Sequence, residues 1–103
     1  MPFLVQVILP IYDNAGRPLP SELTKQVRRE LTEKFGGLTA YTRAPAEGLW
    51  NDEAGVQTRD DIIVYEVMTD VVDAAWWKRF RERLELQFEQ REVLVRAHAV
   101  TKL

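Results

Sequence analysis

Six polar or charged side chains occur in segments that are otherwise rich in apolar, strand-forming residues. These are Gln6, Tyr41, Arg43, Glu66, Arg96 and His98. Successive side chains of a strand point to opposite faces of a sheet, so alternation assigns all six to one face. A histidine near a carboxylate can act as acid or base near neutral pH, which would be the role of His98 beside Glu66. A structural reading is also open, in which Glu66 and Arg96 form a cross-strand ion pair and His98 lies at the rim.

The numbers of cysteine, serine and histidine residues exclude most other kinds of catalytic and metal-binding site. The chain has no cysteine, so zinc–thiolate sites and thiol nucleophiles are ruled out. Ser21 is the only serine and His98 the only histidine, which argues against a Ser-His-Asp hydrolase and against a multi-histidine metal site. No glycine-rich phosphate loop or calcium loop is present. We therefore expect neither a metal nor a cofactor.

The elements that must position these side chains come in the order strand, helix, strand, repeated once. The expected segments are Phe3–Tyr12, Ser21–Phe35 and a strand from Leu38, and then Gln57–Thr69, Asp73–Gln90 and Glu92–Leu103. This β-α-β-β-α-β order predicts a ferredoxin-like α+β fold with an antiparallel four-stranded sheet and two helices on one face. At 103 residues, the whole chain (1–103) is expected to be a single domain.

Local signals set the expected ends of the helices. Ser21 and Asp73 are good N-cap residues, and Gly36 can end the first helix in a left-handed conformation. Trp77 lies on the apolar stripe of the second helix, whereas Trp76 lies off it and is expected to contact a partner chain or the long loop.

A hairpin with a polar tip is expected between the second and third strands. Leu49-Trp50 and Val56-Gln57 flank its turn residues. Trp50, beside the tip, is a candidate for lining a pocket or an interface, with plain packing as the alternative.

The face that carries the polar residues is also apolar. Its expected apolar members are Leu4, Ile8, Ile62, Val64, Met68 and Leu94. An exposed patch of this kind usually marks an interface. We therefore predict a homo-oligomer, most simply a dimer, that uses this face or its edge and forms a dimeric α+β barrel or a related assembly.

Charge and hydropathy restrict partners and location. The net charge of −2 argues against a nucleic-acid partner, because phosphate binding depends on clustered Lys and Arg. No apolar run approaches the roughly 18 residues of a membrane span. The amino terminus has no basic stretch before its apolar residues, so we expect a cytoplasmic protein with no membrane partner.

Two resemblances add to this reading. Phe35-Gly36-Gly37-Leu38-Thr39, Gly48-Leu49-Trp50 and the strand Asp61–Glu66 resemble an uncharacterised bacterial family of short ferredoxin-like domains, which implies the fold but no established activity. Separately, Met1-Pro2-Phe3, a strand and a helix opening at Ser21 resemble the tautomerase superfamily. That likeness implies that Pro2, once Met1 is removed, is a general base, with Arg43 or Arg96 holding a substrate carboxylate.

Two classes of function follow. In the first, the chain is a small-molecule-binding or assembly module without a metal, with a pocket lined by Tyr41, Arg43, Trp50, Glu66 and His98. In the second it is a cofactor-independent acid–base enzyme: a tautomerase that uses Pro2, or an oxygenase of the dimeric-barrel type that uses the sheet face.

Overall fold

The computed structural model describes residues 2–46 and 60–103. The elements are β1 (Phe3–Pro10), α1 (Ser21–Phe35), β2 (Thr39–Ala46), β3 (Asp60–Thr69), α2 (Ala74–Gln87) and β4 (Leu94–Ala99). The strands form one antiparallel sheet in the order β2-β3-β1-β4. The predicted ferredoxin-like α+β fold is thus confirmed. The expected hairpin around Trp50 lies outside the described residues.

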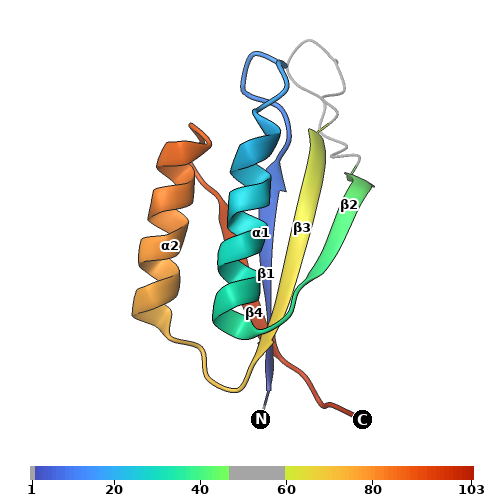
Figure 1. Cartoon of the computed structure of the whole chain (residues 1–103), viewed down its shortest axis with the longest axis vertical. Helices are drawn as coiled ribbons and strands as arrows, with labels where there is room; N and C mark the ends of the chain where they lie inside the picture. Colours follow the sequence, from blue (N-terminus) through green and yellow to red (C-terminus); the bar gives the residue numbers. More distant parts are fainter. Residues whose placement is uncertain (1, 47–59) are drawn as a thin grey trace, which may run out of the picture.

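Both helices lie on the same side of the sheet, in front of it in Figure 1. In β1 the side chains facing them are Val5, Val7 and Leu9, each at most 1% exposed. The same face of β3 contributes Tyr65 and Val67, and the helices contribute a matching apolar set. That set is Val27, Leu31, Trp77, Phe80 and Leu84, with Phe88 at the C-cap of α2. The core therefore lies between the sheet and the helices, which leaves the opposite face of the sheet without a helical cover.

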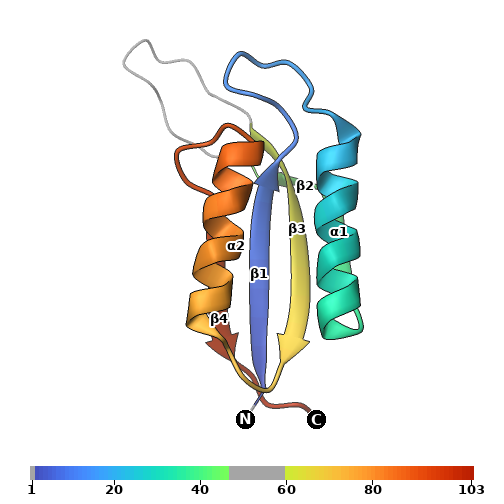
Figure 2. The same cartoon turned by 60° about the vertical axis from the view of Figure 1, so that its left-hand side comes forward.

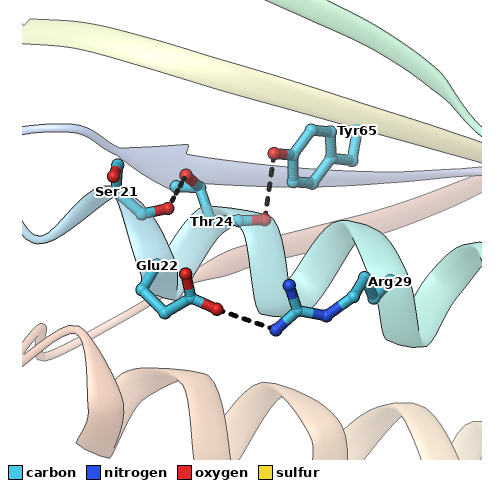
Figure 3. Close-up of polar contacts among 5 residues, drawn as sticks. All are labelled: Ser21, Glu22, Thr24, Arg29 and Tyr65. Atoms are coloured by element: carbon cyan, nitrogen blue, oxygen red, sulfur yellow. Dashed lines mark hydrogen bonds and ion pairs between the residues drawn. The ribbon is translucent and has the colours of Figure 1, made fainter.

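Among the buried residues of the described ranges, Tyr65 alone carries a hydroxyl group. The hydroxyl donates a hydrogen bond to the backbone carbonyl of Thr24 in α1, at 3.1 Å, and so joins β3 to the helix (Figure 3). Burial raises the pKa of the Tyr65 phenol, because its charged form would lose hydration. On the exposed side of the same helix, the hydrogen bond and the charge of Arg29 lower the pKa of Glu22.

The helix ends follow the predicted signals with one exception. Gly36 ends α1 at φ 78°, the left-handed conformation that glycine adopts without a steric cost, and Asp73 caps α2 by accepting a hydrogen bond from the Trp76 N–H. Ser21 is not the N-cap: Pro20 occupies that position and Ser21 is already helical. Proline fixes φ near the helical value, so the chain enters the helix without a side-chain cap.

Two strands and one helix are shorter than predicted. β1 stops at Pro10, whose nitrogen cannot donate to the sheet, and Tyr12 forms an isolated bridge with Pro18 instead. α2 stops at Gln87 because Glu89 adopts a left-handed φ of 52°. β4 keeps only the central part of the predicted strand, Leu94–Ala99.

Trp76 contacts residues of both helices, and its expected contact with a partner chain or the long loop stays a prediction. It stacks on Phe80 at 4.9 Å between ring centroids and meets Phe35 of α1 edge-on at 5.7 Å. The ammonium group of Lys34 lies 4.6 Å from its ring centroid. Trp76 therefore belongs to an aromatic cluster that joins the two helices.

Figure 2 shows both chain ends at the same end of the sheet. The Val100 N–H donates to the Pro2 carbonyl there, which continues the β1–β4 pairing beyond the strands. No helix in residues 2–46 and 60–103 is long and apolar enough to cross a membrane.

Candidate functional site: the open face of the sheet

The side of the sheet away from the helices is here called the open face. Register places its side chains in rows that cross the strands. Its described residues are Leu4, Gln6, Ile8, Thr39, Tyr41, Ile62, Val64, Glu66, Met68, Leu94, Arg96 and His98. The face therefore contains most of the polar residues that alternation predicted for it.

The central row is polar and connected. Gln6 pairs with Glu66 of β3 on one side and with Arg96 of β4 on the other. The Arg96 Nε–H donates to the Gln6 amide oxygen at 2.7 Å, and the Gln6 amide nitrogen donates to the Glu66 carboxylate at 2.6 Å. The sheet thus carries a cation, an amide and an anion in one line, with Gln6 held between two charge-assisted hydrogen bonds.

This arrangement takes the place of the direct ion pair between Glu66 and Arg96 that was the structural alternative. β1 lies between β3 and β4, so the two charged residues are separated by a whole strand and Gln6 contacts both. Thr39 of β2 pairs with Glu66 and continues the row to the edge of the sheet. Thr39 was not predicted as a residue of this face, although its alternation with Tyr41 was a signal for it.

The rows on either side are mainly apolar. Ile8 lies between Leu94 and Val64, and Tyr41 continues that row on β2. Leu4 lies between His98 and Met68 in the other row. Met68 is 47% exposed, Leu94 44% and Tyr41 50%. Tyr41 and Leu94 lie on the edge strands and Met68 lies near the end of β3, and all three leave much of their apolar surface open to solvent.

His98 and Glu66 share the face but not a row. His98 is exposed on β4, and Glu66 lies two strands away in the neighbouring row. Strand spacing of about 4.8 Å and a rise of about 3.3 Å per residue put their Cα atoms roughly 12 Å apart. One chain therefore does not bring this histidine and this carboxylate into the contact that proton transfer between them needs.

Arg43 and Trp50 complete the predicted set. The register of β2 against β3 shifts between Thr42 and Ala44, so Arg43 lies at a β-bulge and Ala44 pairs with Ile62. Simple alternation from Tyr41 to Arg43 therefore fails at this point. The side chain of Arg43 and all of Trp50 lie outside the described residues.

Pro2 lies far from this row, at the end of β1. It lines a surface hollow of about 630 Å³ together with Phe35, Met68, Thr69, Asp70 and two lysines, Lys34 and Lys102. Arg96 pairs with Gln6, four residues along β1, which is about 13 Å from Pro2. The lysines, and not Arg96, are therefore the cations nearest to Pro2 among these residues, and neither lysine was predicted to lie near Pro2.

Within residues 2–46 and 60–103, no three or more His, Asp or Glu side chains gather as a metal-binding group. The polar row offers one carboxylate and one amide, both engaged in hydrogen bonds.

Comparison with known proteins supports the fold. No protein-family model and no curated protein matches the chain. Among solved structures, the divalent cation tolerance protein Cut A1 from Thermus thermophilus matches with a TM-score of 0.61 and 15% identity, covering 99% of this chain and 86% of that chain. A phage SAM lyase in complex with S-methyl-5′-thioadenosine matches with a TM-score of 0.59 and 10% identity, covering 94% and 80%. The chain is therefore a small ferredoxin-like α+β domain similar in fold to both.

Proposed function

We propose that this chain is an assembly module that forms a homodimer by packing its open face against the open face of a second copy. The observation that carries the proposal is the exposure of Met68, Leu94 and Tyr41, each close to half exposed, around partly buried Leu4 and Ile8. Burying such a patch against an identical one removes apolar surface from water on both sides.

The area of the open face sets how tightly the two copies are expected to bind. The whole face, with four strands about 4.8 Å apart and each about 25 Å long, presents at most about 500 Å² per copy. The total of at most about 1,000 Å² does not exceed the lower limit for a specific interface. We therefore expect a weak dimer, with a dissociation constant in the micromolar range.

An assembly module is favoured over a small-molecule pocket formed within one chain. Tyr41 lies on β2 and His98 on β4, which are the opposite edges of the sheet. Three strand spacings across the sheet and four residues along it separate their Cα atoms by about 20 Å, too far for both to enclose one small ligand on a flat surface. The hydrogen-bonding groups of Gln6 are also engaged already by its two neighbours.

Light scattering across a concentration series tests the proposal. The wild type is expected to pass from monomer to dimer in the micromolar range, and Met68→Asp and Leu94→Asp should remain monomeric because each buries a charge in the interface. Val71→Asp is the matched control, since Val71 is 74% exposed and lies outside the sheet. A monomeric wild type throughout the range, or an equal effect of Val71→Asp, would contradict the proposal.

A second candidate, acid–base catalysis by Pro2, is favoured by one observation. Pro2 shares its hollow with Lys34 and Lys102, whose positive charges suit an anionic substrate. The nitrogen becomes a basic secondary amine only after Met1 is removed. Mass spectrometry of the untagged protein tests this first: retention of Met1 eliminates the candidate, and removal calls for an enol–keto assay in which Pro2→Ala abolishes turnover while His98→Ala does not.

A further inference from the structure

The open face carries opposite charges in an arrangement that is complementary to itself. Arg96 and Glu66 lie in one row, on the two strands that flank β1, with Gln6 midway between them. Each is therefore about 4.8 Å from the line of β1, on opposite sides.

We infer that the two copies are related by a two-fold axis parallel to the strands and directly over β1, so that Arg96 of each copy pairs with the partner's Glu66. This inference rests on the proposed dimer and adds its symmetry. A half-turn about that axis exchanges the two sides of β1 and leaves positions along the strand unchanged. Each guanidinium group then lies over a carboxylate, and the two Gln6 side chains meet at the axis.

The same rotation keeps apolar residues opposite apolar residues. Leu94 and Val64 flank Ile8 in their row, so the half-turn places Leu94 over the partner's Val64 and Ile8 over the partner's Ile8. In the other row, Leu4 meets the partner's Leu4, and His98 lies over the partner's Met68. Large hydrophobic side chains thus lie on both sides of the charged row. Because the axis lies over β1, three strands of each copy face each other, and β2 with Tyr41 lies beyond the partner's β4.

Other two-fold axes pair the charged residues of the two copies less well. An axis along the charged row, perpendicular to the strands, would place Arg96 over the partner's Arg96 and Glu66 over the partner's Glu66. Like charges in such contacts cost several kcal/mol. An axis over β3 would again oppose Glu66 to itself and would carry Arg96 beyond the edge strand β2. Among these axes, only the one over β1 pairs both charges.

The distances allow this pairing. Packed sheets lie about 10 Å apart, which the long side chains of Arg and Glu together can span. Aligned sheets also rotate by about 30° relative to each other. At about 4.8 Å from the axis, that rotation displaces the partner group by only about 2.5 Å, within the reach of a flexible arginine. The two ion pairs would fix the orientation of the copies more than they strengthen the dimer.

Charge exchange between copies provides the test, with sedimentation velocity as the readout. Glu66→Arg alone brings two cations together at each pair, and Arg96→Glu alone brings two anions together. Each single variant should raise the dissociation constant at least about tenfold. An equimolar mixture of the two should restore a dimer, because every pair then joins an arginine to a glutamate.

The double variant Glu66→Arg/Arg96→Glu provides a second measurement that does not depend on how the single variants fold. It should form a dimer with itself, yet fail to associate with fluorescently labelled wild type, because the mixed pair opposes like charges. A mixture of single variants that stays monomeric, or a double variant that associates freely with wild type, overturns the inferred axis. If Met68→Asp still abolishes the wild-type dimer, the proposed function survives that outcome; if the wild type is monomeric, both fail.

Discussion

Two leucines in α2 provide a matched test of the described core. Leu84 is fully buried and Leu86 is 80% exposed, although both lie in the same helix and both become alanine with the same change in helix propensity. Leu84→Ala leaves a cavity beneath the sheet, for which we expect a loss of about 3 kcal/mol in the free energy of unfolding. In a domain of this size, that loss lowers the melting temperature by roughly 12–24 °C.

The assay is urea and thermal unfolding followed by circular dichroism, at one low protein concentration so that self-association does not contribute. Leu86→Ala should change the free energy of unfolding by no more than about 0.5 kcal/mol. If the two variants lose similar stability, or if Leu86→Ala loses more, then α2 does not present the face to the sheet that the structure describes.

Three further predictions concern the helix ends and the buried tyrosine. Gly36→Ala should cost about 1 kcal/mol because residue 36 has φ 78°, whereas Gly37→Ala, at a position without a positive φ, should be neutral or slightly stabilising in urea unfolding. Asp73→Ala removes the cap of α2 and should cost about 1 kcal/mol, with a loss of helical signal in circular dichroism. The raised pKa of Tyr65 means that the unfolded phenol ionises first, so its contribution to stability is complete below about pH 10 and is lost as pH rises through the folded pKa. Tyr65→Phe should therefore flatten the alkaline decrease in the free energy of unfolding, and an unchanged slope would contradict a buried phenol.

The sequence predicts the elements well where one physical signal dominates. Helix α1 has its predicted ends because an apolar residue recurs at every fourth position and Gly36 can adopt a left-handed conformation. The cap at Ser21 was wrong because Pro20, whose ring fixes φ near the helical value, occupies the N-cap position and Ser21 is already helical. The contact of Trp76 with Phe35 was not predicted because it depends on α1 lying beside α2, and the apolar stripe of one helix contains no information about its neighbour.

The sequence predicts which side chains share a face of the sheet, but it does not predict which of them share a row across the strands. Alternation places Gln6, Glu66 and Arg96 on one side of the sheet, yet only the strand register shows that they share one line with Gln6 in the middle. A shift of two residues would retain the face and separate the charges. The bulge at Arg43 is a local departure that alternation cannot anticipate.

The central claim is that a second copy covers the open face, and methyl NMR with a soluble paramagnetic agent tests it most directly. Met68 and Leu94 report on the face, while Val71 and Leu86, 74% and 80% exposed, report on surface elsewhere. At concentrations where the dimer forms, the account predicts that the Met68 and Leu94 methyl signals are protected while those of Val71 and Leu86 are attenuated. Dilution to the monomer should then expose all four. Attenuation of Met68 and Leu94 as strong as that of Val71 in a sample proven to be dimeric would contradict the account.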